Sequence, residues 1–230
     1  NPNFYLMTER FGNAAGEPGD VFSDLFKEGN FNRSSGNMES ILVWQIIEGV
    51  IGGAGSYKLS ETGFGTGNNL TRGFAPFLVD YVGSDGNSGW LYDPANNPAG
   101  VDTVGGVGYG RGAGFVRPSN YTLYDIWQEY WDDMRNSKYN MKREFYFNNP
   151  ESDYYKQKWD PAIHQTRDKD TGRYVYAYSL KVEGPFFQGG EGNFKGRTTK
   201  DAYLIRLAET YLLRAEAYFK KGELQNAADD

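Results

Sequence analysis

The stretch between residues 49 and 114 combines aromatic rings and polar side chains with many glycines. Aromatic faces are good platforms for flat ligands and sugar rings, while amides, carboxylates and guanidinium groups hydrogen-bond to ligand hydroxyls. The chain as a whole is 17% aromatic and contains 30 glycines. We therefore predict a ligand-binding site here, with rings from Trp90, Tyr92, Tyr81 and Tyr109 and polar partners Asn68, Asp80 and Arg111.

Trp90 is the first candidate among these side chains. It stands between Gly89 and Leu91 in a loop that is rich in Gly, Ser and Asn, where an indole exposed without a ligand is costly. The alternative interpretation makes Trp90 a loop anchor that inserts into the core. The sequence leaves both interpretations open.

Metal and thiol chemistry find little support in this sequence. The chain has no cysteine and one histidine, His164, which excludes disulfides, zinc–cysteine sites and two-histidine metal sites. No recognisable nucleophile accompanies His164, so we interpret it as a surface or turn histidine. The motif Asp168-x-Asp170-x-Gly172 departs from a calcium loop at its later positions, and we interpret it as a hairpin turn. No metal site and no cofactor are predicted.

Catalytic motifs are absent from the sequence as well. There is no Gly-x-Ser-x-Gly nucleophile elbow, and the glycine runs match neither the phosphate loop nor the dinucleotide fingerprint. A glycosidase needs two facing carboxylates, and the spacing of the 30 acidic residues singles out no pair. We therefore predict a protein that is not an enzyme, with a glycan-active hydrolase as one alternative.

Charge and hydropathy exclude two further classes. The chain carries 24 basic and 30 acidic residues, and this acidic balance argues against nucleic acid as a partner. It has no apolar run of membrane-spanning length and no visible signal peptide.

The clearest element expected to support the site lies at the end of the chain. Apolar residues recur every three or four positions from Asp201 to Gly222, which predicts one long amphipathic helix. A second helix begins at Glu223 or Leu224, and small Ala215 and Ala227 allow the two helices to pack closely. This spacing is typical of half a tetratricopeptide repeat, which needs neighbouring repeats to bury its apolar face. We expect such neighbours before Asn1 and after Asp230.

Weaker patterns predict the remaining elements. Residues 38–47 form an apolar, β-branched run that predicts a buried strand, with Trp44 in the core. Residues 121–135 predict a short helix with one aromatic face, and residues 174–180 predict a strand. We therefore divide one structural domain into a loop-rich ligand-binding region, residues 1–200, and a truncated helical hairpin, residues 201–230.

Five segments of the sequence form a recognisable set. The clearest is the helix Leu204-Ile-Arg-Leu-Ala-Glu-Thr-Tyr-Leu-Leu-Arg-Ala-Glu-Ala-Tyr218. The others are Asn37-Met-Glu-Ser-Ile41, Arg117-Pro-Ser, Trp131-x-x-Met-Arg-Asn-Ser137 and Asn140-x-x-Arg143. In content and order these segments resemble the SusD/RagB family of outer-membrane nutrient-binding lipoproteins of Bacteroidetes.

The resemblance implies a mainly α fold, in which tetratricopeptide-like hairpins form an α-α superhelix beside a large loop-rich ligand-binding part. It implies a surface-exposed outer-membrane lipoprotein, anchored by a lipid outside this fragment, that captures a glycan without catalysis. The glycan then passes to a SusC-like TonB-dependent transporter. The hairpin is the face that such proteins present to this partner, with Arg206, Glu209 and Arg214 as candidate contacts.

Three alternatives stay open beside glycan capture. A member of the same family can bind peptides, a hydrolase can act on the glycan, and a plain tetratricopeptide adaptor can bind a protein. The long aromatic loops argue against the adaptor, whose helices are joined by short turns. The family's ligand residues follow no motif, so the sequence does not identify the ligand.

Overall fold

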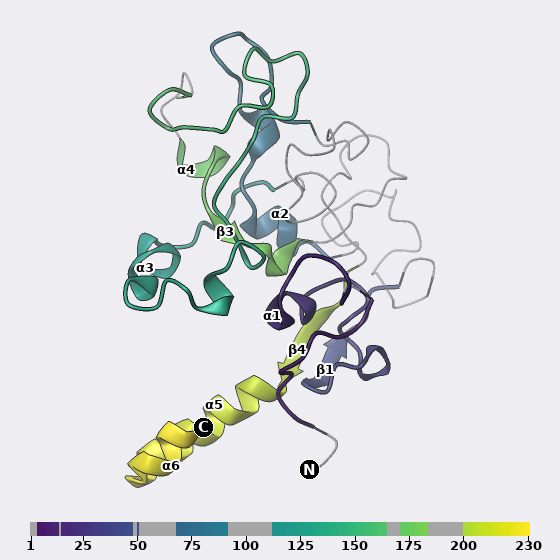
Figure 1. The fold of residues 1–230 in the computed structure, drawn as a ribbon, viewed down its shortest axis with the longest axis vertical. Coiled ribbons are helices and arrows are strands. Elements are labelled where there is room, and N and C mark those ends of the chain that lie inside the picture. Colours follow the sequence, from purple (N-terminus) through teal and green to yellow (C-terminus); the bar gives the residue numbers. More distant parts are fainter. Residues whose placement is uncertain are drawn as a thin grey trace. The chain divides into compact units, whose positions relative to one another are not determined.

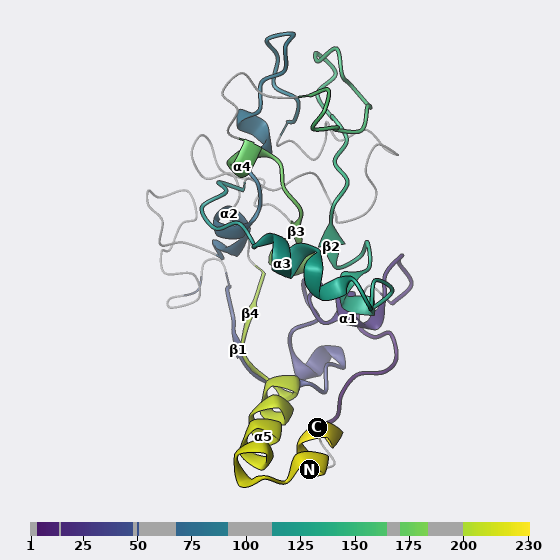
Figure 2. The same cartoon turned by 90° about the vertical axis from the view of Figure 1, so that its left-hand side faces the viewer.

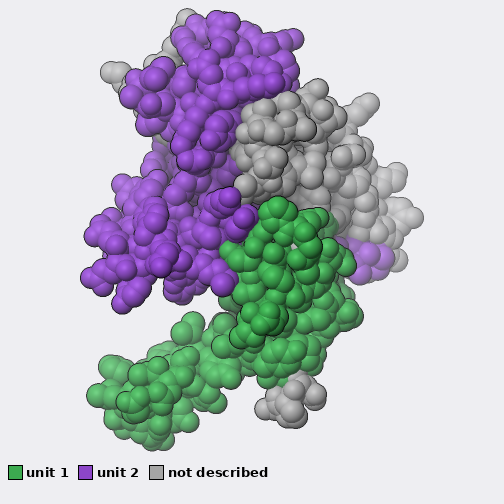
Figure 3. Space-filling view, viewed as in Figure 1, with its two compact units in different colours: residues 1–45, 201–230 green, residues 46–200 purple. Residues whose placement is uncertain are grey.

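The computed structural model describes residues 4–13, 15–47, 50, 68–91, 112–164, 171–183 and 200–230. The chain divides into two compact units, which are coloured separately in Figure 3. Unit 1 comprises residues 1–45 and 201–230, and unit 2 comprises residues 46–200. Our predicted ligand-binding region, residues 1–200, therefore contains residues of both units.

The described chain is rich in short helices and has some short strands (Figure 1). Unit 1 contains α1 (Val21–Asp24), the 3-10 helix η1 (Arg33–Ser35), β1 (Ser40–Trp44), β4 (Ala202–Arg206), α5 (Leu207–Lys221) and α6 (Leu224–Asp229). Unit 2 contains α2 (Leu70–Phe74), η2 (Leu78–Asp80), α3 (Asn120–Leu123), η4 (Asp125–Trp127), η5 (Met134–Asn136), β2 (Met141–Lys142), α4 (Thr171–Tyr174), β3 (Tyr178–Ser179) and η6 (Leu180–Val182).

Strands β1 and β4 form a two-stranded antiparallel sheet (Figure 2), with Ser40 opposite Arg206 and Trp44 opposite Ala202. The strand predicted within residues 38–47 is confirmed, because its β-branched and aromatic residues favour an extended backbone. The predicted burial was wrong, since Trp44 is 57% exposed. Pairing with β4 satisfies the backbone of β1 along one edge, but it does not cover the side chains on the faces of the sheet.

The long helix predicted from residue 201 begins six residues later than expected. Residues 202–206 form β4, and Arg206 precedes the helix with an extended backbone, at φ −125° and ψ 152°. The apolar pattern continues without a break across this boundary, so periodicity gave no sign of it. Pairing with β1 overrides the helical pattern, because Tyr203 and Ile205 are well suited to a strand once a partner is present.

Helices α5 and α6 form the predicted hairpin at the C-terminal end of the chain (Figure 2). Gly222 has the left-handed backbone, φ 77°, that ends α5, and its N–H donates to the Phe219 carbonyl at 2.9 Å. The predicted seam is half-buried at Ala215 and Ala227. Other apolar side chains of the hairpin are exposed, namely Leu212, Leu213, Phe219 and Leu224.

Tyr203 of β4 holds the N-terminal segment of unit 1 in place. Its ring lies 4.6 Å from the Phe31 ring and 5.8 Å from the Phe26 ring, measured between centroids. Its hydroxyl donates to the Leu25 carbonyl at 2.6 Å and accepts from the side-chain amide of Asn37. Burial raises the pKa of the Tyr203 hydroxyl, which keeps it neutral and able to donate. One side chain thereby joins segments that lie far apart in the sequence.

Unit 2 is built around a core of aromatic rings. Its buried members come from four stretches of the chain: Ala75, Leu78, Tyr81, Trp90, Phe145, Phe147, Val175, Tyr176, Tyr178 and Leu180. Strands β2 and β3 connect two of these stretches, with Met141 opposite Ser179 and Lys142 opposite Tyr178. The strand predicted at residues 174–180 is therefore confirmed only at Tyr178–Ser179, since Tyr174 ends α4 and Leu180 begins η6.

We predict that Tyr203→Phe destabilises the protein by about 1–3 kcal/mol, because two buried hydrogen bonds lose their shared hydroxyl. Urea unfolding followed by circular dichroism measures the change. Tyr130→Phe is the matched control, since Tyr130 is exposed and should tolerate loss of its hydroxyl. Equal stability of Tyr203→Phe and the unchanged protein would contradict the role assigned to this hydroxyl.

Candidate functional site

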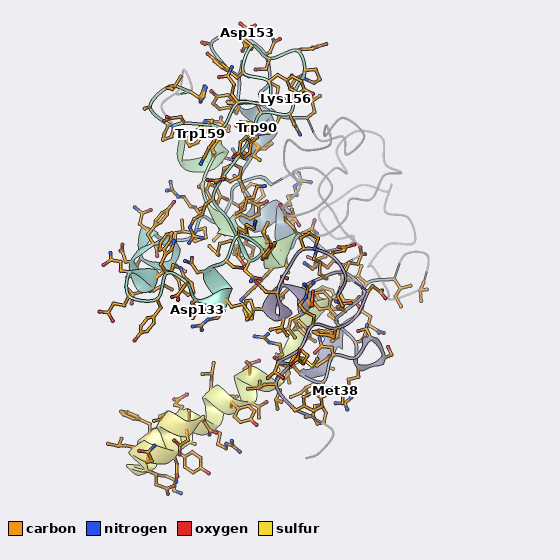
Figure 4. All side chains as sticks on the ribbon, viewed as in Figure 1. Met38, Trp90, Asp133, Asp153, Lys156 and Trp159 are labelled. Carbon is orange, nitrogen blue, oxygen red and sulfur yellow. The ribbon has the colours of Figure 1, made fainter. Side chains whose placement is uncertain are left out.

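Trp90 lies in the core of unit 2, where Figure 4 labels it. Only 1% of its surface is exposed, and its ring stacks on Phe147 with centroids 4.5 Å apart and planes at 20°. The indole N–H donates to the Tyr146 carbonyl at 2.8 Å. Both the face and the polar edge of the ring are therefore occupied. This structure favours the loop-anchor interpretation of Trp90 over the ligand-platform interpretation.

Tyr81 is equally buried and packs edge-to-face against Trp90, with centroids 5.2 Å apart. Its hydroxyl donates to the His164 carbonyl at 2.7 Å. Burial raises the pKa of Tyr81 to about 12. The neutral hydroxyl fixes the segment that carries His164, so the structure gives this second predicted platform a structural role.

The two polar candidates that the structure describes, Asn68 and Asp80, differ in exposure. Asn68 is buried, and its amide donates to the Lys200 carbonyl at 2.9 Å while its oxygen accepts from Leu70 N–H at 2.8 Å. Asp80 is exposed at the end of η2. The other three candidates, Tyr92, Tyr109 and Arg111, lie outside the described residues.

The three predicted partner contacts differ in exposure. Arg206 has a side chain only 19% exposed, 3.5 Å from the Glu39 carboxylate, so it belongs to the packing of unit 1. Glu209 is exposed in the first turn of α5. Arg214 is also exposed, and its Nε donates to the Asp230 carboxylate at 2.7 Å, which ties α5 to the end of α6.

His164 is buried and not at the surface, but it closes a turn as predicted, since its N–H donates to the Asp160 carbonyl at 2.8 Å. Its ring meets the rings of Phe147 and Tyr154 edge-on, at 5.0 Å and 4.7 Å between centroids. Nδ1 accepts from the Asp160 N–H at 2.8 Å, and the buried Nε2 has no hydrogen-bond partner among the residues that the structure describes. Burial lowers the pKa of His164. Within the described parts of the chain, no three His, Asp or Glu side chains are grouped to hold a metal.

An exposed aromatic surface lies elsewhere in unit 2, on residues 121–134. It contains Tyr121 and Tyr130, Trp131 at 55% exposure, and the less exposed ring of Tyr124. Exposed aromatic side chains gathered within one short segment make that segment a candidate binding surface. We define these four rings as the aromatic surface. Figure 4 labels Asp133 in the same segment.

The guanidinium group of Arg143 contacts two of these rings, Tyr124 and Trp131. Its guanidinium carbon lies 5.7 Å from the Tyr124 ring centroid and 5.1 Å from that of Trp131, within the range of cation–π attraction. Its Nη2 donates to the Leu123 carbonyl at 2.7 Å and to Asn136 Oδ1 at 2.6 Å. Burial lowers the pKa of Arg143, although an arginine stays charged near neutral pH. Both rings thus contact the same side chain, which is itself held by hydrogen bonds.

Short local contacts determine the path of the backbone between these rings. Ser119 caps α3, since its hydroxyl accepts from Thr122 N–H at 3.3 Å. The Trp127 indole donates to the Thr122 carbonyl at 3.1 Å, and Asp133 accepts from Arg135 N–H at 2.8 Å ahead of η5. The predicted single helix over residues 121–135 is therefore wrong: the segment forms three short turns of helix.

Carboxylates border the aromatic surface. Asp125, Glu129 and Asp132 are all exposed, whereas Asp133 is bound by Arg135 in a two-point ion pair. Rings with neighbouring acceptors suit a ligand that has apolar C–H faces and many hydroxyls. The sequence pattern showed the aromatic spacing of this segment. That spacing fits one face of a helix, so the sequence alone predicts a helix here and not a ligand surface.

The sequence model of the SusD family matches residues 80–230, a range that includes the aromatic surface, Arg143 and the hairpin. No curated protein and no solved structure matches the chain. None of the helices in the described ranges combines the length and the apolar character needed to cross a membrane.

We predict that Trp90→Ala destabilises the protein by about 3–5 kcal/mol, because it opens a cavity beside Phe147 and removes the hydrogen bond from the indole N–H to the Tyr146 carbonyl. Trp90→Phe should cost clearly less, since it keeps most of the ring packing. Urea unfolding measures both changes. A fully stable Trp90→Ala protein that loses ligand affinity would restore the platform interpretation.

We also predict that stability falls as pH drops through the ordinary histidine pKa of about 6.5. The pKa of His164 is lowered in the folded state, so the unfolded chain binds the proton more tightly. The stabilising contribution is complete above that pH and is lost below it. Urea midpoints between about pH 8 and pH 5 measure the effect. His164→Asn, which keeps an acceptor near the Nδ1 position, should flatten the profile; an unchanged profile would contradict the assignment.

Proposed function

The chain belongs to the SusD family, and on that premise we propose that it is a cell-surface protein that captures a glycan without cleaving it. The proposal includes passage of the glycan to a SusC-like TonB-dependent transporter. It also includes attachment to the outer membrane of a Bacteroidetes cell as a lipoprotein. Family membership supports nutrient binding, and the aromatic surface supports a glycan as the nutrient.

The single observation behind the glycan proposal is the pair of rings held over Arg143. Tyr124 and Trp131 are exposed, yet each lies within 6 Å of the Arg143 guanidinium, whose Nη2 donates to the Leu123 carbonyl and to Asn136 Oδ1. Rings that are already ordered lose little conformational entropy when a sugar stacks on them. Exposed carboxylates at Asp125 and Asp132 then accept hydrogen bonds from sugar hydroxyls.

Tyr92, Tyr109 and Arg111 remain proposed ligand contacts on the strength of their residue types alone. Among the other predicted ligand residues, Asp80 is the one that is exposed. Trp90, Tyr81 and Asn68 support the fold instead, through the contacts described above. The proposed ligand surface therefore shifts from the glycine-rich stretch towards residues 121–134.

We further propose that the hairpin is part of a tetratricopeptide-like scaffold that contacts the transporter. The exposed apolar side chains of α5 and α6 support this proposal, because such faces normally pack against neighbouring helices. Glu209 and Arg214 are exposed and suited to a partner interface, whereas Arg206 is engaged with Glu39.

Affinity-gel electrophoresis against a panel of polysaccharides tests the proposal, with reducing ends assayed in the same samples. We expect retardation in at least one gel and no new reducing ends. Trp131→Ala should weaken that binding by about tenfold, as expected for a central aromatic contact. Trp44→Ala is the matched control, because Trp44 is exposed to 57% against 55% for Trp131 and lies in unit 1.

Other results would contradict the proposal in distinguishable ways. New reducing ends would indicate a glycan hydrolase. Retardation that Trp131→Ala leaves unchanged would place the glycan away from the aromatic surface. Failure to bind every polysaccharide, combined with binding of peptides, would indicate a peptide-binding member of the family.

A further inference from the structure

Two arginines of unit 2, Arg117 and Arg173, have no carboxylate partner in the described part of the chain. Four other arginines each pair with a carboxylate: Arg10 with Asp24, Arg135 with Asp133, Arg206 with Glu39 and Arg214 with Asp230. Carboxylates are not scarce, since the chain has 30 acidic against 24 basic residues. The two arginines are therefore candidates for binding an anion from outside the chain.

Residues 113–116, which lead to Arg117, are fastened to α2 and the residue after it by backbone hydrogen bonds. Three N–H groups of this segment donate to carbonyls there: Ala113 to Arg72 at 2.8 Å, Gly114 to Ala75 at 3.0 Å and Val116 to Gly73 at 3.0 Å. Pro118 follows Arg117 and restricts its backbone to extended conformations. The backbone that carries Arg117 is therefore held from both sides.

Arg173, which comes from α4, is held at the start of the same segment. Its Nε donates to the Ala113 carbonyl at 2.7 Å. Its guanidinium carbon lies 4.8 Å from the centroid of the Phe77 ring and 5.7 Å from that of Phe115. Gly114 permits this close approach, because a Cβ at that position would lie 2.6 Å from the Arg173 carbonyl oxygen. A fixed positive charge thus lies beside the Phe115 ring, which is 60% exposed.

Arg117 is exposed, and its guanidinium carbon lies 5.7 Å from the centroid of the buried Tyr176 ring. Such a contact uses the face of the guanidinium plane and leaves the N–H donors at its edge available. Tyr176 also shows that the two arginines are near one another. Burial raises the pKa of its hydroxyl to about 12, while the charges of Arg117 and Arg173 both act in the opposite direction. Both guanidinium groups therefore lie near this hydroxyl.

An exposed ring beside two positive charges has the chemistry that an acidic sugar needs. Guanidinium groups bind a carboxylate through paired N–H donors. Aromatic faces bind the apolar C–H face of a sugar ring. A hexuronic acid carries both groups in one molecule, whereas an inorganic anion offers only the charge and a neutral sugar offers only the C–H face. The arrangement at Phe115 therefore fits a hexuronic acid better than either simpler ligand.

We propose that Phe115, Arg117 and Arg173 bind a hexuronic acid unit of an acidic glycan. Arg117 donates to the sugar carboxylate, Phe115 contacts the sugar ring, and Arg173 adds a second positive charge. Exposed Asp125 and Asp132 repel a carboxylate from the aromatic surface, so the acid group binds at the arginines instead. The proposal rests on glycan capture as the function and adds the class of sugar. Its residues are separate from the four rings of the aromatic surface, so the two can be tested apart.

The first experiment runs the whole protein in affinity gels that contain polygalacturonate, alginate or hyaluronan, three polymers with different hexuronic acids. The methyl ester of each polymer is the matched control, because it keeps the sugar and removes the charge. We expect at least one acid polymer to retard the protein and its ester to bind about tenfold more weakly. Non-specific attraction does not explain such a result, since the chain has a net charge of −6. Equal retardation by acid and ester, or none by all three acids, would overturn the proposal.

The second experiment locates the acid polymer on the protein. Arg117→Gln should weaken binding about tenfold, the effect of losing one charge-assisted pair of hydrogen bonds. Lys156→Gln is the matched control, since it also removes one exposed positive charge from unit 2 and should leave binding unchanged. Circular dichroism verifies that both variants fold. Unchanged binding by Arg117→Gln, or an equal loss in both variants, would contradict the assignment of the carboxylate to Arg117.

Comparison with Trp131→Ala in the same gels separates this site from the aromatic surface. Acid-polymer binding that Arg117→Gln weakens and Trp131→Ala does not would support the acidic-sugar site and move the glycan away from the aromatic surface. A loss in both variants would support one glycan that contacts both sites. A loss in Trp131→Ala alone would refute the acidic-sugar site and leave glycan capture at the aromatic surface in place.

Discussion

The arrangement of the aromatic surface depends on Arg143, which has no carboxylate partner among the described residues. Its Nη2 donates to the Leu123 carbonyl and to Asn136, and its Nε is buried and has no hydrogen-bond partner in the described part of the chain. A buried charge of this kind is costly unless its surroundings stabilise it. Here the rings of Tyr124 and Trp131 supply part of that stabilisation through their negative faces. The need to stabilise one cation therefore keeps two large rings ordered at the surface.

A comparable constraint governs unit 1, where the chain must bring residues 40–44 and 202–206 together to form a sheet. Closing so long a loop costs entropy, which only interactions across the closure can offset. Tyr203 makes several of them, since its ring contacts Phe26 and Phe31 while its hydroxyl bonds to Leu25. The sheet of unit 1 therefore depends on contacts that one tyrosine makes across the closure.

Local patterns predicted the elements that depend on local interactions. The α5–α6 hairpin followed from apolar spacing, Gly222 and the small residues Ala215 and Ala227, all of which act within a few turns. The start of α5 was mispredicted because Tyr203 and Ile205 satisfy a helical period and a strand equally well, and a distant partner decides between them. The exposure of Trp44 was mispredicted for a related reason, since an apolar strand does not reveal how many layers cover it.

Two tryptophans of unit 2 show why the sequence alone did not identify the candidate site. Trp90 and Trp131 are both indoles within polar sequence, yet one is 1% exposed and the other 55%. The difference depends on residues farther along the chain: Trp90 stacks on Phe147 and donates to the Tyr146 carbonyl, whereas the Arg143 guanidinium lies 5.1 Å from the centroid of the exposed Trp131 ring. Sequence supplies the ring, but the three-dimensional distribution of its partners decides its role.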